Sequence, residues 1–133
     1  MQGLLSWFDQ FADAPIPKQL LLQCQLALIE GFTNAVRHAH KHLPADTPIQ
    51  IQVEMSEQSI DIRIWDQGPG FDLQSTLENS FNHHNEGMAS GRGLKIIYKV
   101  ADQLTYCSHQ SQGNCLHLHR QGPWSESAMI IRS

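Results

Sequence analysis

Residues 28–39 read LIEGFTNAVRHA and form the centre of a helical pattern that runs from Lys18 to about His42 and stops before Pro44. Successive residues on a helix are rotated by about 100°, which separates this segment into two faces. One face is apolar and contains Leu21, Cys24, Leu28, Phe32, Ala35, Ala39 and Leu43. The opposite face is polar and contains Glu30, Asn34, Arg37, His38 and Lys41.

The polar face carries two side chains that suit a reaction. Glu30 and Asn34 are neighbours because they are four residues apart on a helix. The carboxylate is a candidate general base, and the amide offers a neutral oxygen ligand for a hard cation. The alternative is a solvated face, on which Glu30 is only a helix surface residue or forms a salt bridge with Arg37 or Lys41. Gly31 costs about 1 kcal/mol relative to Ala inside a helix, which indicates that another group approaches closely there.

Two strands follow the helix. The first shows an alternating pattern whose apolar positions are Ile49, Ile51, Val53 and Met55. The second, Ser59–Asp66, repeats the alternation with Ile60, Ile62 and Ile64. Glu57 and Gln58 are expected to join the two strands as an antiparallel hairpin. Asp66 shares the parity of the three isoleucines, so its carboxylate is expected to point to the interior and to need partners there.

The second strand ends in a glycine-rich turn. Gly68 and Gly70 follow Asp66 closely and allow a ligand to approach the backbone. The alternative is a plain turn after a hairpin, with Asp66 acting as its cap. Residues 72–90 show no clear period, which predicts a long mobile segment without a helix or strand.

A second pair of glycines opens the next helix. Gly91-Arg92-Gly93 precedes a helical pattern that continues to Ala101. The unpaired N–H groups and the dipole at a helix start suit a phosphate, and Arg92 and Lys95 add positive charge. Taken alone this signal is weak, because glycines also end loops.

The chain closes with a second hairpin, over residues 103–109 and 114–120 around Gly113. The order of elements predicts an α+β, two-layer sandwich with helices on one face of a mainly antiparallel sheet. We expect a short N-terminal lead over residues 1–17, one domain over residues 18–121, and a C-terminal tail over residues 122–133.

Composition excludes several classes of protein. The 133 residues carry a formal charge of −4, which is unlike a general nucleic-acid-binding protein with its basic face. The apolar runs are shorter than the ~20 residues of a membrane span, and the N-terminus lacks the pattern of a signal peptide. Three irregularly spaced cysteines favour reduced thiols in the cytoplasm over a disulfide framework.

The three motifs in this order resemble the gyrase/histidine-kinase ATPase superfamily (GHKL, Bergerat fold). Residues 28–39 are similar to the N box of its bacterial anti-sigma factor serine/threonine kinases. Residues 66–72, DQGPGFD, resemble their G1 box, and residues 91–94, GRGL, resemble their G2 box. The resemblance covers about residues 18–120 and implies a histidine-kinase-like ATPase fold with a mixed, mainly antiparallel sheet.

The resemblance implies a site for ATP and Mg²⁺. Asn34 would hold the Mg²⁺ that bridges the phosphates, and Asp66 would accept a hydrogen bond from the adenine amino group, with Gly70 making room beside it. Residues 72–90 would be the lid over the nucleotide. The residues expected to bind ATP are Asn34, Arg37, His38, Asp66, Gly68, Gly70, Gly91, Arg92, Gly93 and Leu94.

Glu30 would be the general base that takes a proton from a serine or threonine of a partner protein. The implied function is therefore a kinase of the anti-sigma type, whose partners are a sigma factor, the antagonist of the anti-sigma factor, or both. Two alternatives stay open: a non-catalytic switch in which ATP gates partner binding, and a detached ATP-binding domain of a histidine kinase. The short lead also leaves open whether the chain forms the homodimer of this branch.

Three features differ from the family pattern. Family members usually begin with a strand and a full helix before the N-box helix, whereas only seventeen residues precede Lys18. A threonine usually follows the glycine of the last hairpin and supports the adenine-binding carboxylate, whereas Asn114 follows Gly113 here. The sequence also lacks an upstream pair of helices carrying a phosphoacceptor histidine, which argues against a complete sensor kinase.

Other histidines and cysteines are interpreted more simply. His38 and His42 share a helix face and could bind a metal, but solvated histidines at a helix end explain them better. His117 and His119 are expected on the sheet face away from the helices, as surface residues rather than ligands. Cys107 and Cys115 are expected opposite one another in the closing hairpin, as a pair of half-buried thiols rather than a redox pair.

Overall fold

The computed structural model describes residues 2–82, 89–109 and 111–124, with the side chains at positions 2, 80, 82 and 89–92 outside this description. The helical elements are α1 (Gln2–Phe8), α2 (Lys18–Asn34), a π-helical turn (Ala35–Ala39), α3 (Leu73–Asn82) and α4 (Ala89–Val100). A short 3₁₀ turn (Asp9–Phe11) follows α1. The strands are β1 (Gln50–Met55), β2 (Ser59–Asp66), β3 (Gln103–His109) and β4 (Gly113–Gln121).

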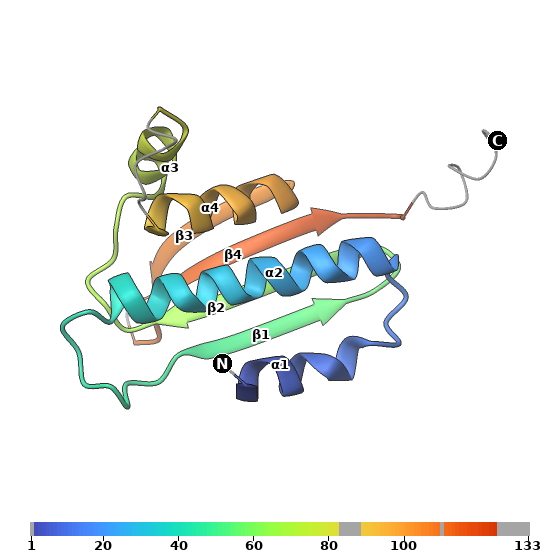
Figure 1. Cartoon of the computed structure of the whole chain (residues 1–133), viewed down its shortest axis with the longest axis horizontal. Coiled ribbons are helices and arrows are strands. Elements are labelled where there is room, and N and C mark those ends of the chain that lie inside the picture. The colour runs from blue at the N-terminus through green and yellow to red at the C-terminus, as the bar shows by residue number, and fades with distance from the viewer. Residues whose placement is uncertain (1, 83–88, 110, 125–133) are drawn as a thin grey trace.

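The four strands form one sheet in the order β1-β2-β4-β3, and each of the three pairings is antiparallel. Helices α2 and α4 lie over one face of this sheet (Figure 1). The predicted α+β two-layer sandwich is therefore confirmed. Both predicted hairpins are present, β1 with β2 and β3 with β4. The pairings that the structure describes include no parallel one, so this sheet is antiparallel rather than mixed.

The core lies between the sheet and the two covering helices. Ile60 and Ile62 of β2 are almost fully buried, as are Leu28 of α2 and Ile97 of α4. Residues of the N-terminal lead join the same core cluster, which contains Phe8. Burial of each such side chain stabilises the fold by roughly 1.5–3 kcal/mol.

The strongest departure from the sequence prediction is α3. We expected no helix within residues 72–90, but residues 73–82 are helical. Asp72 caps this helix, because its carboxylate accepts a hydrogen bond of 3.1 Å from the Ser75 N–H. Leu77 is buried, and α3 packs against α4. The helix is stabilised by this tertiary contact, which a search for a sustained period does not detect. The rest of the predicted lid, residues 83–88, lies outside the described residues.

Two helix ends also differ from the prediction. The N-box helix is α-helical only to Asn34, and a π-helical turn carries it to Ala39 rather than to His42. Helix α4 begins at Ala89, so the G2 glycines lie within its first two turns rather than before it. None of the helices in the described part of the chain is long and apolar enough to cross a membrane.

Candidate functional site

Asp66 ends β2 with a buried carboxylate, as the alternation of the strand predicts. Only 4% of the residue is exposed. Its Oδ1 accepts hydrogen bonds from the Gly68 N–H and from the Asn114 side-chain amide, both at 2.9 Å. Its Oδ2 accepts a hydrogen bond of 2.8 Å from the Tyr106 hydroxyl. These three donors compensate for the burial of the carboxylate.

The carboxylate of Asp66 keeps capacity for one further donor. An ionised carboxylate offers about four acceptor positions, and the three hydrogen bonds above leave one, on Oδ2. A ligand with an N–H group, such as the amino group of a purine, matches this position. The adenine contact that the resemblance implies would fall on an acceptor whose other partners are already fixed.

Asn114 takes the position at which the family pattern has a threonine beside its glycine. Its amide nitrogen donates to Asp66 and also to the Gly68 carbonyl at 2.8 Å. Its amide oxygen accepts a hydrogen bond of 2.6 Å from the Ser108 hydroxyl. Asn114 thus links the end of β2, the G1 turn and β3, and it supports the carboxylate in a different way from a threonine.

Tyr106 of β3 contacts Asp66 through its hydroxyl and Phe71 through its ring. Its ring lies 4.2 Å from the ring of Phe71, centroid to centroid. Burial raises the pKa of the Tyr106 hydroxyl, and the hydrogen bond to the Asp66 carboxylate raises it further. The hydroxyl therefore stays protonated and remains a donor at any physiological pH.

The G1 turn is held against the end of the N-box helix. A Cβ on Gly68 would lie 2.1 Å from the Ala39 carbonyl oxygen, so only glycine fits there. The Gln67 N–H donates a hydrogen bond of 2.8 Å to Nε2 of His40, a residue that is 9% exposed. Gly70 has a φ of +89°, a conformation that favours glycine. The space at Gly68 is therefore filled by the protein's own backbone.

Gly31 has a similar explanation. The cost of a glycine inside a helix indicates a close neighbour, and this neighbour is Ile64 of β2. A Cβ on Gly31 would lie 2.3 Å from the Ile64 Cδ1 atom. The glycine lets α2 approach the sheet, and this approach positions the polar residues of α2.

Glu30 lies against the start of α4. A Cβ on Gly93 would be 2.9 Å from the Glu30 Oε1 atom. Neither Arg37 nor Lys41 forms an ion pair with Glu30 in the part of the chain that the structure describes. The salt-bridge interpretation of Glu30 is therefore wrong for these two partners. The N-box helix and the G2 glycines, 63 residues apart at these positions, meet at this contact.

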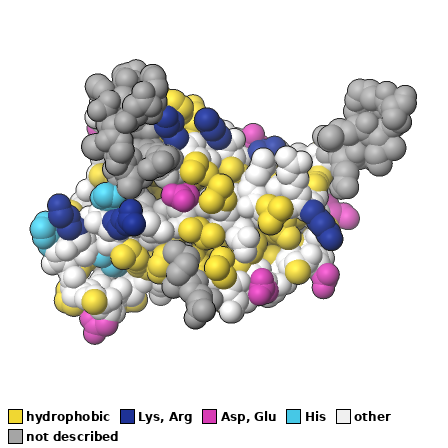
Figure 2. Space-filling view, viewed as in Figure 1, with side chains coloured by type: hydrophobic (Ala, Val, Ile, Leu, Met, Phe, Trp, Pro, Cys, Tyr) yellow, Lys and Arg dark blue, Asp and Glu magenta, His cyan; other side chains and the backbone are white. Residues whose placement is uncertain are grey.

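Asn34 lies one helical turn after Glu30, and the basic residues Arg37 and His38 lie in the π-helical turn that follows. Asn34 is half-buried, and its amide makes no side-chain hydrogen bond within residues 2–82, 89–109 and 111–124. A neutral amide oxygen of this kind suits Mg²⁺. Arg37 and His38 are exposed, and Figure 2 shows Lys, Arg and His side chains gathered at this end of the molecule. Partial desolvation of the His38 ring lowers its pKa, and the charges of Arg37 and Lys41 lower it further.

The other residues at the start of α4 have different surroundings. Leu94 is a core residue, 1% exposed, which anchors the start of α4. Gly91 and Arg92 belong to the first turn of α4, but the Arg92 side chain lies outside the described residues. The Lys95 ammonium lies 5.6 Å from the centre of the Phe81 ring of α3. The same helix start thus contacts both Glu30 and the α3 helix.

Comparisons with known proteins agree with these motifs. A family model described as the histidine kinase-like ATPase domain matches residues 1–120. The chain is also similar to proteins named anti-sigma F factor from Bacillus cytotoxicus, Bacillus thuringiensis and Bacillus anthracis. Each is 28% identical to it over 99 residues, which cover 74% of this chain and 67% of the relative.

Proposed function

Because the chain belongs to the family of histidine kinase-like ATPases, we propose that it is an ATP-dependent regulator of the anti-sigma type. It binds ATP with Mg²⁺ and transfers the γ-phosphate to a serine or threonine of a partner protein. The anti-sigma F factors to which the chain is similar support this assignment. The partner is a sigma factor, the antagonist of the anti-sigma factor, or both.

The adenine end of the proposed site is Asp66. Its free acceptor position on Oδ2 receives the adenine amino group, while Asn114 and Tyr106 hold the carboxylate. Gly68 and Gly70 shape the turn that follows. Asp66 therefore recognises the base by hydrogen-bond direction, which distinguishes an amino group from a carbonyl.

The phosphate end of the proposed site is the start of α4. Gly91 lies in the first turn, where backbone N–H groups have no partner within the helix and favour anions. Gly93, in the next turn, leaves room for Glu30 beside this helix start. Asn34 is proposed to hold the Mg²⁺, which neutralises charge on the phosphates when it is bound. Arg37, His38 and Arg92 complete the set of residues proposed to contact ATP, and Leu94 supports the site from the core by anchoring the start of α4.

One contact carries the proposal of catalysis: the position of Glu30 beside Gly93. It puts a carboxylate without an ion-pair partner in Arg37 or Lys41 next to the proposed phosphate cradle. A base at this place can orient the partner's hydroxyl and accept its proton as the phosphoryl group is transferred.

Free thiols at Cys24, Cys107 and Cys115 agree with action in the cytoplasm.

Calorimetry with ATP tests the binding half of the proposal. In millimolar Mg²⁺, Asp66→Asn should remove most of the ATP affinity, because the amide presents a donor where an acceptor is needed. An unpaired buried group costs about 1–3 kcal/mol, which is roughly a 5- to 150-fold loss. Asn34→Ala should reduce the affinity only when Mg²⁺ is present.

Asp46→Asn is a matched control, because Asp46 is exposed in the loop before β1. Circular dichroism reports whether each variant is folded. A folded Asp66→Asn protein that binds ATP as tightly as the wild type would contradict the assignment of Asp66. Equal effects of Asn34→Ala with and without Mg²⁺ would contradict the metal assignment.

A further inference from the structure

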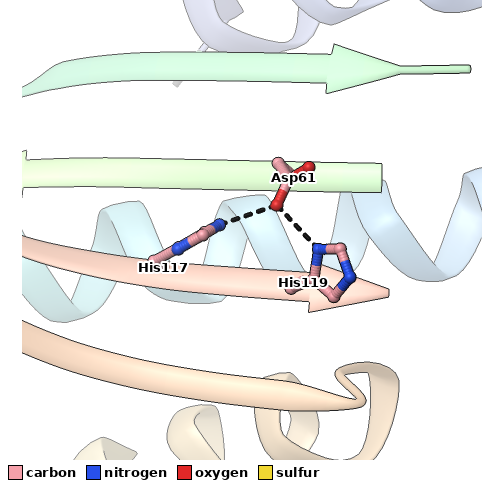
Figure 3. Close-up of side chains that lie close together, drawn as sticks. All are labelled: Asp61, His117 and His119. Atoms are coloured by element: carbon pink, nitrogen blue, oxygen red, sulfur yellow. Dashed lines mark hydrogen bonds and ion pairs between the residues drawn. The ribbon is translucent and has the colours of Figure 1, made fainter. Parts of the chain in front are cut away.

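The open face of the sheet carries a cluster of three side chains that the ATP site does not use. Asp61 lies on β2, and His117 and His119 lie on β4, directly beside it. Asp61 and His119 are register partners across the two strands. The sequence predicts both histidines on the face away from the helices, and the structure adds the carboxylate between them. Figure 3 shows the three side chains converging.

The three side chains already point their ligand atoms at one another. Oδ1 of Asp61 lies 2.7 Å from Nε2 of His117 and 2.8 Å from Nδ1 of His119. All three ligand atoms lie within 4.8 Å of one another. Ligands of a tetrahedral zinc ion, at about 2.0–2.1 Å from the metal, are about 3.3 Å apart. The two contacts to Asp61 therefore have to open by about half an ångström to admit the ion, while the two imidazole nitrogens, which lie within 4.8 Å of each other, have to take up the same separation of about 3.3 Å.

The surroundings of the cluster suit a cation. Arg63, the register partner of His117, pairs its guanidinium with Glu54 at 2.8 Å, and Glu54 is the register partner of Asp61 on β1, so the charge of Arg63 is neutralised beside the cluster. Nε2 of His119 lies 3.1 Å from the Gln121 side-chain oxygen. When Nδ1 of His119 binds a metal, Nε2 carries the proton and donates a hydrogen bond to that oxygen. Such a hydrogen bond fixes the orientation of a ligating imidazole.

The cluster is accessible from solvent. The side chains of His117, His119 and Asp61 are 31%, 25% and 18% exposed. A metal bound by two imidazoles and one carboxylate would keep at least one position for water or another ligand. Its nitrogen ligands favour zinc and its neighbours among the transition metals over Mg²⁺, which prefers oxygen.

We propose that Asp61, His117 and His119 form a binding site for a divalent transition metal, zinc above all, on the sheet face opposite the ATP site. This site is separate from the Mg²⁺ position assigned to Asn34, which lies on the helix layer. Its occupancy does not require ATP.

Titration of the chelator-treated 133-residue chain with Zn²⁺ in a calorimeter tests the proposal. The wild type should bind one equivalent that survives addition of millimolar Mg²⁺. His117→Gln and His119→Gln should each weaken this binding at least 10- to 100-fold, since even the loss of a residue that only supports a ligand has that effect. Zn²⁺ should also raise the melting temperature of the wild type but not of these two variants.

His42→Gln is the matched control, because His42 is exposed in the turn that follows the N-box helix. It should bind Zn²⁺ as the wild type does, whereas loss of binding here would move the metal to the helix histidines and overturn the proposal. Wild-type protein that binds no Zn²⁺ would overturn it too. So would folded His117→Gln and His119→Gln proteins that keep wild-type affinity, folding being checked by circular dichroism.

Discussion

The side-chain amide of Asn114 donates a hydrogen bond of 2.9 Å to Oδ1 of Asp66 across 48 residues of sequence. The two residues are register partners on neighbouring strands, and both are buried. The pair fixes the direction of the carboxylate proposed to recognise adenine. In the family pattern a threonine has this supporting role, so an asparagine shows that the same support can be built with a different side chain.

The first prediction concerns this pair. Asn114→Ala should lower the free energy of unfolding by about 1–3 kcal/mol, because it removes one partner of a buried carboxylate. It should also weaken ATP binding, since Asp66 loses its fixed orientation. Denaturant unfolding and ATP calorimetry measure the two effects. Asn114→Thr, which restores the family residue, should recover more of the ATP affinity than Asn114→Ala, and equal affinities would refute the supporting role.

The second prediction concerns the contact between α2 and the sheet. Gly31→Ala should destabilise the protein by about 1–3 kcal/mol, because the new Cβ collides with the Ile64 Cδ1 atom. Ile64→Val removes that atom. The double variant Gly31→Ala with Ile64→Val should therefore be more stable than the sum of the two single effects predicts. Strict additivity in a double-mutant cycle would show that this contact does not explain the glycine.

The third prediction concerns the thiols. Cys24 is fully buried, and burial raises its pKa to about 11. Cys115 is buried as well, and burial raises its pKa. Both should be protonated and shielded from alkylation at pH 8, whereas Cys107 is exposed. Mass spectrometry after brief labelling should find the label on Cys107 alone in the native protein and on all three thiols in denaturant. Rapid native labelling of Cys24 would contradict the packing described here.

The sequence alone predicts most of the sheet. The period-2 alternation in β1 and β2 settles the two faces and the inward direction of Asp66, because a strand in one register offers no other choice. Gly68 marks the turn that ends β2, and Gly113 marks the turn between β3 and β4. The polar face of α2 follows equally from its helical period.

Contacts between distant residues could not be predicted in this way. Tyr106 and Asn114 meet Asp66 only because β3 and β4 lie beside β2, and nothing in their local sequence indicates this. The sequence analysis does not predict helix α3 for the same reason, because this helix is stabilised by packing against α4, with Leu77 buried. A local signal for that helix does exist: Asp72 as a cap, followed by Leu73 and Leu77 four residues apart.

The partnership of Asp61 with two histidines is a further case. His117 and His119 are visible in the sequence as a pair on one face of a strand. The carboxylate that joins them comes from a strand more than fifty residues earlier. Histidines on a strand are more often surface residues than ligands, so only the register of β2 against β4 raises the metal hypothesis.

Glu30 is proposed to act as the base in phosphoryl transfer. Its side chain lies against Gly93 at the proposed phosphate cradle. General bases contribute about 10²–10⁴-fold to a rate. A residue that serves only as part of a solvated helix face contributes little.

Transfer of the γ-phosphate from radiolabelled ATP to the protein partner, in a single turnover, measures this most directly. Glu30→Ala should bind ATP as the wild type does but transfer phosphate about 10²–10⁴-fold more slowly, while Glu57→Ala, which removes an exposed carboxylate in the turn between β1 and β2, should match the wild type. Wild-type rates from Glu30→Ala would contradict the claim, and wild-type protein that transfers nothing to a partner it binds would make ATP-gated binding the better account.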